Sequence, residues 1–136
     1  MGQIREVMTA QPKSCGRDAS VRDAAKLMAK EDVGPIPVVD GDRLVGLVTD
    51  RDLVLRVLAE GRDPESTTVG EIASSDVVTV SPDEDLDRAL KLLAQHQVRR
   101  LPVVENERLV GIVAQADIAR MGKDEKTGQI VEEISR

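Results

Sequence analysis

The chain carries one stretch of sequence twice. Residues 37–53 read Pro-Val-Val-Asp-Gly-Asp-Arg-Leu-Val-Gly-Leu-Val-Thr-Asp-Arg-Asp-Leu. Residues 102–118 return 65 positions later, without a gap, as Pro-Val-Val-Glu-Asn-Glu-Arg-Leu-Val-Gly-Ile-Val-Ala-Gln-Ala-Asp-Ile. A repeated supersecondary unit of this kind does not bury its apolar face alone. We therefore expect two like halves that pack on one another about a pseudo-two-fold axis.

Periodicity predicts the same elements in both halves. Ser20 followed by Asp23 marks a helix start, Asp40-Gly41-Asp42 is a hairpin turn signal, and Thr49 caps the next helix. The predicted elements are a helix from residue 21 to about residue 32, strands at 36–39 and 43–48, a helix at 50–60 that ends at Gly61, a helix at 86–97, strands at 100–104 and 108–113, and a helix from 115. The fold class is therefore α/β.

Four segments follow from this pattern. We expect a first repeat at 1–61, a polar linker at 62–70, a second repeat at 71–122 and a C-terminal tail at 123–136. In the tail, Ile130, Val131 and Ile134 form one apolar stripe among charged residues. Either a docking tail or a frayed end fits that pattern.

Composition excludes several kinds of protein. The 136 residues carry a net charge of −6, which disfavours a nucleic-acid binder, and they include no Phe, Tyr or Trp. Cys15 and His96 are the only residues of their types, so an intrachain disulfide, a zinc site built from several thiols or imidazoles, and most nucleophile-base sets are excluded. No stretch is apolar enough for a signal peptide or a membrane span. We expect a cytoplasmic protein with no membrane contact, no metal site, no catalytic residue and no enzymatic activity.

The most specific local motif is Thr49-x-x-Asp52. A hydroxyl and a carboxylate at this spacing cap a helix, and that structural role alone accounts for both residues. The second copy has Ala114 and Asp117. Ala114 has no hydroxyl, yet Asp117 is still present, so a capping pair with a hydroxyl does not explain the carboxylate at this position. Its favourable interaction with the helix dipole is a sufficient structural explanation.

The segment before each hairpin is the other half of a prospective site. Val33-Gly-Pro-Ile-Pro37 and Val98-Arg-Arg-Leu-Pro102 contain prolines, which limit strand pairing and leave neighbouring backbone groups free for a ligand. Ordinary strand entries fit the same pattern. Arg99 and Arg100 make the second segment cationic, and guanidinium groups suit phosphate oxygens, although solvated surface arginines are an equal reading.

These residues resemble a known family, the paired cystathionine-β-synthase (CBS) domains or Bateman modules. The resemblance runs from Ile4 to Met121 and rests on the two Pro-Val-Val runs and the runs that end at Asp52 and Asp117. The chain looks most like small stand-alone two-repeat members, the hypoxia-response type of actinobacteria among them. The resemblance implies two α-β-α-β-β-α repeats packed sheet to sheet.

The resemblance also implies ligands and site residues. It implies clefts between the repeats that accept AMP, ADP, ATP or S-adenosylmethionine as regulatory ligands, with no cofactor required. By position, Asp52 and Asp117 would accept hydrogen bonds from ribose hydroxyls, and Thr49, Arg99 and Arg100 would meet phosphate. The residues implied to surround the base are Val33, Ile36, Pro37, Val98, Leu101 and Pro102.

Some positions depart from the family pattern. Ala114 stands where the motif expects Thr or Ser, which weakens phosphate binding in the second cleft unless the arginines compensate. Cys15 stands where the second copy has Val80, and is most simply a small buried apolar residue. His96 is expected at a helix C-terminus, where it interacts with the dipole.

The resulting functional hypothesis is a non-enzymatic sensor that binds an adenosine-containing ligand and acts on an unknown regulated protein. Members of the family commonly form homodimers through helix faces, and the apolar stripes 53–58 and 118–121 are compatible with this. The alternative is a ligand-free dimeric interaction protein whose clefts are vestigial.

Overall fold

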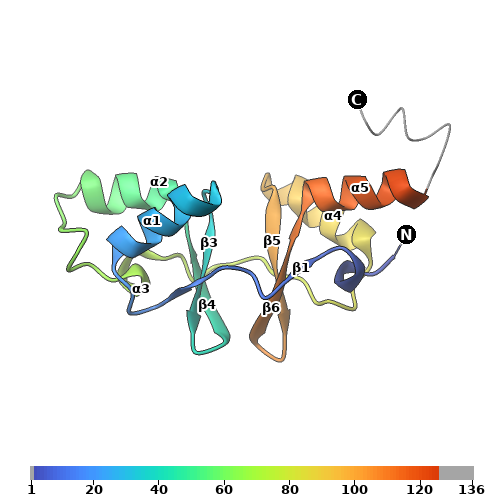
Figure 1. Ribbon diagram of the computed structural model, residues 1–136, viewed down its shortest axis with the longest axis horizontal. Helices are drawn as coiled ribbons and strands as arrows, with labels where there is room; N and C mark the ends of the chain where they lie inside the picture. Colours follow the sequence, from blue (N-terminus) through green and yellow to red (C-terminus); the bar gives the residue numbers. More distant parts are fainter. Residues whose placement is uncertain (1, 126–136) are drawn as a thin grey trace. The chain divides into compact units, whose positions relative to one another are not determined.

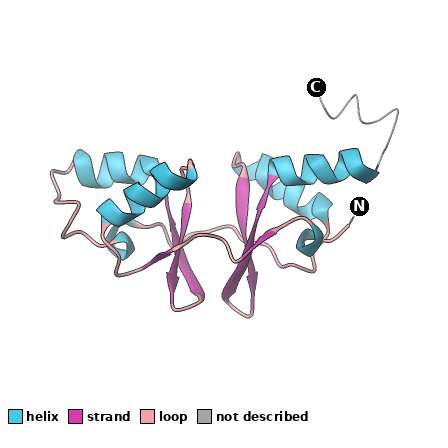
Figure 2. Cartoon of the chain, viewed as in Figure 1, coloured by secondary structure: helices cyan, strands magenta, loops and turns pink. Residues whose placement is uncertain are grey.

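The computed structural model describes residues 2–125 as an α/β fold with two compact units (Figure 1, Figure 2). The first-repeat unit contains Lys13–Val77 with Glu107–Leu109. The second-repeat unit contains the described parts of Met1–Pro12, Val78–Asn106 and Val110–Arg136. The apolar stripe expected in the tail lies outside the described residues. Over residues 2–125, no helix has the length and apolar character needed to cross a membrane.

Both units are built on an antiparallel hairpin, as predicted. The first-repeat unit consists of β2 Cys15–Gly16, α1 Val21–Glu31, β3 Ile36–Asp40, β4 Arg43–Val48, α2 Asp50–Leu53, η2 Val54–Leu58 and α3 Val69–Ile72. The second-repeat unit consists of η1 Ile4–Glu6, β1 Thr9–Ala10, α4 Leu86–His96, β5 Arg100–Glu105, β6 Arg108–Ala114 and α5 Gln115–Glu125. In each unit a long helix, α1 or α4, precedes the hairpin, and α2 or α5 follows it (Figure 1).

Local chemistry explains why these elements begin and end where they do. The backbone N–H of Asp23 donates to Ser20 Oγ at 3.1 Å, which confirms the predicted start of α1. Helices α1 and α4 end at equivalent residues, Asp32 and Gln97, which both adopt the left-handed conformation with φ of 54°. The first hairpin turns at Gly41, with φ of 68°, where a residue without a Cβ tolerates that backbone.

The helix after β4 differs from the prediction of one regular helix over 50–60. Only α2 is α-helical, and η2 is a π-helix. The backbone N–H of Ala59 donates to Val54 O at 2.9 Å, and that of Arg62 donates to Val57 O at 2.9 Å, so each bond spans five residues. The wider turn changes which side chains face the core, which sequence periodicity does not reveal.

Each compact unit takes its short lead-in helix from the other repeat. In the second-repeat unit, the backbone N–H of Leu86 at the start of α4 donates to Gly2 O at 2.9 Å. In the first-repeat unit, the N–H of Val21 at the start of α1 donates to Thr67 O at 2.9 Å. These two bonds join equivalent positions, so the exchange of η1 and α3 between the repeats is reciprocal. The repeat boundaries in the sequence and the packing boundaries in space therefore differ.

A glycine in each hairpin makes room for the exchanged segment. A Cβ on Gly46 would lie 2.8 Å from Ser74 O, and a Cβ on Gly111 would lie 3.1 Å from Thr9 O. A side chain at Gly46 would require the backbone to move, and one at Gly111 would make an unusually tight contact. The same residue type at both positions thus serves the same close approach of backbone to backbone.

Two aliphatic cores hold the units together. The buried residues of the first-repeat core are Cys15, Val21, Ala24, Met28, Ile36, Val38, Val48, Val57, Val69 and Ile72. Those of the second-repeat core are Ile4, Val80, Leu86, Ala89, Leu92, Leu93, Leu101, Val103, Val113 and Ile118. With no aromatic side chain in the sequence, both cores depend on many small interdigitating contacts. The prediction that Cys15 is a small buried residue is confirmed, since it is 6% exposed.

Candidate functional site

The start of α2 holds Thr49 and Asp52 in a reciprocal capping box. The backbone N–H of Asp52 donates to Thr49 Oγ1 at 3.1 Å, and the N–H of Thr49 donates to Asp52 Oδ2 at 2.9 Å. The predicted cap is confirmed, and both side chains are held by the backbone. The Asp52 side chain is 18% exposed, so it is neither solvated freely nor fully packed away.

The start of α5 presents the second carboxylate without a cap. Ala114 ends β6 and has no side-chain oxygen to cap the helix, and Asp117 forms an ion pair with Arg120. The Asp117 side chain is 19% exposed, close to the value for Asp52. The two carboxylates therefore have the same placement and burial but different partners.

In each unit the segment before the hairpin lies against the start of the following helix. The backbone N–H of Asp50 donates to Gly34 O at 3.2 Å, and the N–H of Gln115 donates to Arg99 O at 2.9 Å. These bonds are equivalent in the two repeats. They bring each pre-hairpin segment next to the helix turn that carries Asp52 or Asp117, so the structure groups the predicted residues within each unit.

The side chains predicted to surround a base divide into two groups. Ile36 and Leu101 are each 1% exposed and fill the two cores, and Pro37 and Pro102 are buried as well. The structure gives Ile36 and Leu101 a packing role, because each side chain lies in the aliphatic core of its unit. Only their backbone groups remain available to a ligand.

Val33 and Val98 remain accessible. Val33 is half-buried, and Val98 is 41% exposed, which is high for a large aliphatic side chain. Arg99 and Arg100 are exposed, and neither forms an ion pair with the side chains described over residues 2–121. The second-repeat unit therefore has two exposed arginines within its pre-hairpin segment, whereas the first-repeat unit has Gly34 and Pro35 at the equivalent positions.

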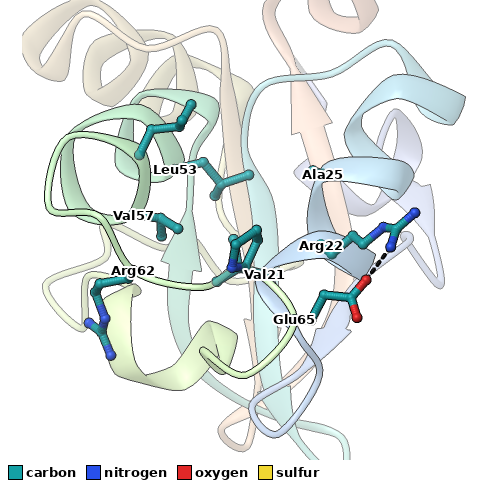
Figure 3. Close-up of a pocket in the computed structure, with 9 residues that line it drawn as sticks. Val21, Arg22, Ala25, Leu53, Val57, Arg62 and Glu65 are labelled. Atoms are coloured by element: carbon teal, nitrogen blue, oxygen red, sulfur yellow. Dashed lines mark hydrogen bonds and ion pairs between the residues drawn. The ribbon is translucent and has the colours of Figure 1, made fainter.

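An apolar groove in the first-repeat unit was not predicted. It has a volume of about 460 Å³ and is lined by Val21, Arg22, Ala25, Leu53, Val57, Leu58, Arg62, Pro64 and Glu65. Leu53 of α2 and Val57 of η2 lie near Val21 of α1, and the ion pair of Arg22 with Glu65 lies at the rim of the groove (Figure 3). No residue of the predicted ligand site lines this groove. The apolar stripe over 53–58 was its signal in the sequence.

The two apolar stripes, at residues 53–58 and 118–121, differ in their exposure to solvent. Val54, Leu55 and Leu58 are 52%, 47% and 74% exposed, so the first stripe does present an apolar face. Ile118 is 2% exposed and belongs to the second-repeat core. Ile118 is therefore a core residue of its own unit, so it does not contribute to an exposed helix face.

The remaining chemically distinctive residues lie apart from the predicted site. Burial raises the pKa of the Cys15 thiol, which lies in the first-repeat core. His96 is the exposed last residue of α4, as expected. Over the described residues, no group of three or more His, Cys, Asp or Glu side chains is close enough to hold a metal ion.

Comparison with known proteins gives a consistent result along the whole chain. The model of the CBS domain matches twice, at residues 4–59 and 69–124. The CBS domain-containing protein YhcV of Bacillus subtilis is 41% identical over 136 residues, which cover 99% of this chain and 96% of that protein. Hypoxic response protein 1 of Mycobacterium tuberculosis is 39% identical over 135 residues, which cover 98% of this chain and 94% of that protein.

Solved structures show the same fold. The crystal structure of Hypoxic Response Protein I with two coordinated zinc ions has a TM-score of 0.80 and 40% identity, and the match covers 89% of this chain and 99% of that one. The crystal structure of CBSX2 in complex with AMP has a TM-score of 0.80 and 28% identity, and the match covers 93% of this chain and 100% of that one. The predicted α/β class and the two tandem repeats are confirmed, and the chain belongs to the CBS domain family.

Proposed function

We propose that this protein is a non-enzymatic regulatory sensor that binds an adenosine-containing ligand, such as AMP, ADP, ATP or S-adenosylmethionine. The observation that carries the proposal is the repeated placement of Asp52 and Asp117. Each lies in the first turn of the helix after its hairpin, with about one fifth of its side chain exposed, beside a pre-hairpin segment. Carboxylates so placed are suited to accept hydrogen bonds from ribose hydroxyls.

The neighbouring residues supply the other contacts that such a ligand needs. Thr49 Oγ1 accepts a backbone N–H, so its own O–H is free to donate to a phosphate oxygen. Arg99 and Arg100 are exposed cations that suit the same group in the second-repeat unit. Val33 and Val98, with the backbone of their segments, provide an apolar and hydrogen-bonding surface for the base.

A ligand that binds one arrangement of the protein better than another shifts the population toward that arrangement. No further chemistry is required of such a sensor, and the CBS domain is the family that the chain matches. We propose that the response is passed to a separate regulated protein in the cytoplasm, without contact to nucleic acid or membrane.

We propose that the protein acts as a homodimer. Val54, Leu55 and Leu58 form an exposed aliphatic face, of the kind that marks an interaction surface. The same face supports the alternative function, a dimeric interaction protein whose ligand sites are vestigial. Leu58→Asp should convert a dimer to a monomer in light scattering after size exclusion, and in the alternative it should also abolish partner capture, with or without nucleotide.

The thermal melt followed by far-ultraviolet circular dichroism tests the proposed ligand. AMP, ATP or S-adenosylmethionine at 100 times its dissociation constant should stabilise the fold by about 2.7 kcal/mol and raise the melting temperature by several degrees. Asp52→Asn with Asp117→Asn should abolish the shift, because ribose hydroxyls lose their charged acceptors. Asp50→Asn, an exposed carboxylate in the same turn, is the matched control and should retain it. The absence of a shift with all three ligands contradicts the proposal.

A further inference from the structure

Arg56 joins the predicted ribose acceptor to another helix. Its Nε lies 3.8 Å from Asp52 Oδ1, and its Nη1 donates to Ile72 O at 2.8 Å. Ile72 is the last residue of α3, and carbonyls at a helix C-terminus have no partner within their own helix. The guanidinium therefore has a fixed anchor on one side and the Asp52 carboxylate on the other.

Asp52 is consequently held through both of its oxygens. Oδ2 accepts the N–H of Thr49 at 2.9 Å, and Oδ1 faces Arg56. A carboxylate has about four lone-pair sites, so the hydrogen bond and the ion pair favour one orientation and still leave acceptor positions for a ligand. Fixing a binding group before the ligand arrives lowers the entropy lost on binding.

The second repeat lacks this arrangement. Met121 stands where the first repeat has Arg56, and Asp117 pairs with Arg120, whose side chain is 70% exposed against 53% for Arg56. Over the described residues, Arg120 has no hydrogen bond to a second element. Asp117 also has no capping partner, because Ala114 carries no hydroxyl.

We propose that Arg56 is a positioning residue that orients Asp52 toward a vicinal diol, an inference that rests on the proposed function. It predicts that the first-repeat carboxylate distinguishes ribose from 2′-deoxyribose more strongly than the second-repeat carboxylate does. The distinction depends on orientation, since both hydroxyls must reach one carboxylate at the same time. A residue that only stabilised the fold would change affinity for both sugars alike.

Calorimetric titration with AMP and 2′-deoxy-AMP tests this inference in the full chain. Asp117→Asn leaves Asp52 as the reporting carboxylate, and in this background we expect AMP to bind about tenfold more tightly than 2′-deoxy-AMP. Adding Arg56→Met, the residue of the second repeat, should lower that ratio to about two or three. Adding Arg56→Lys should give an intermediate ratio, because an ammonium keeps the charge without reaching both partners as a fork.

Arg51→Met is the matched control. It removes the same charge from the adjoining helix α2, and Arg51 forms no ion pair with the described residues. An unchanged ratio in Arg51→Met with a reduced ratio in Arg56→Met supports the inference. Equal ratios in the two variants, or an unchanged ratio in both Arg56 variants, overturn it and leave the proposed function standing. A wild-type protein that binds neither nucleotide overturns both.

Discussion

The two helix starts that carry Asp52 and Asp117 have nearly the same backbone but different chemistry. In the first repeat, Thr49 and Asp52 satisfy one another's backbone groups. In the second, Ala114 leaves the helix start without a side-chain cap, and Asp117 turns to Arg120. The comparison shows that the carboxylate is retained where its capping partner is lost, so helix capping alone does not account for it.

The pre-hairpin segments complete this comparison. Gly34 and Arg99 use equivalent carbonyls to accept equivalent backbone N–H groups. Their side chains differ completely, so one segment is small and uncharged while the other carries two adjacent arginines. The same backbone arrangement thus carries different side chains in the two repeats, with a reciprocal capping box in the first and two adjacent arginines in the second.

The largest effect is expected where the repeats are most alike, in their cores. Ile36→Ala and Leu101→Ala should each lower the free energy of unfolding by about 2–5 kcal/mol, because each side chain is 1% exposed and leaves a cavity. Urea titration followed by circular dichroism is the measurement, since the chain has no aromatic residue for fluorescence. The swaps Ile36→Leu and Leu101→Ile are controls that should cost less than about 1.5 kcal/mol. A negligible cost for either alanine variant contradicts the assigned core.

Exchanging the residue at the capping position between the two repeats should change the free energy of unfolding by a smaller amount, with opposite signs in the two repeats. Thr49→Ala should lower the free energy of unfolding by about 0.5–2 kcal/mol, because the N–H of Asp52 loses its acceptor. Ala114→Thr should raise it by up to about 1 kcal/mol by supplying the missing acceptor in α5. Thr49→Ser keeps the oxygen and is the control in the same denaturation experiment. Equal signs for the two exchanges would break the comparison.

The smallest effect concerns Cys15 and its counterpart Val80. Because burial raises the pKa of the Cys15 thiol, the folded state keeps the proton that the unfolded chain loses above about pH 8.5. Stability that is fully present below that pH should therefore decline as the pH rises further. Cys15→Val, which copies the second repeat, should remove this part of the decline in urea titrations at pH 7.5 and 9.5. An identical decline in wild type and Cys15→Val contradicts the buried, protonated thiol.

Local chemistry was predictable from the sequence because it depends on near neighbours. Ser20, the turn at Gly41 and the Thr49 cap are each specified within three or four residues, and each was confirmed. The π-helix over 54–58 was not predictable, since the same aliphatic residues satisfy a turn of either width. The difference between buried Val57 and exposed Val54 was likewise apparent only in the structure.

Contacts between residues far apart in the sequence were harder to predict. The lead-in helices of the two repeats have the same apolar pattern, so nothing local indicates that η1 and α3 pack on the opposite repeats. Likewise, the family resemblance placed Ile36 and Leu101 beside a ligand, yet both side chains are buried in the cores, where β3 and β5 bury several consecutive residues. In contrast, Asp52 and Asp117 could be chosen as candidates from the sequence, because the repeat marks them as equivalent.

A nuclear magnetic resonance titration of the backbone amides with AMP tests the central claim most directly. We predict saturable shifts at the amides of Asp52 and Asp117 and in the segments 33–37 and 98–102, with smaller changes elsewhere. Both sets should vanish in the protein with Asp52→Asn and Asp117→Asn. Shifts confined to the apolar groove near Val21 and Leu58, or no saturable shift at any concentration, would contradict the assignment of these carboxylates as ligand acceptors.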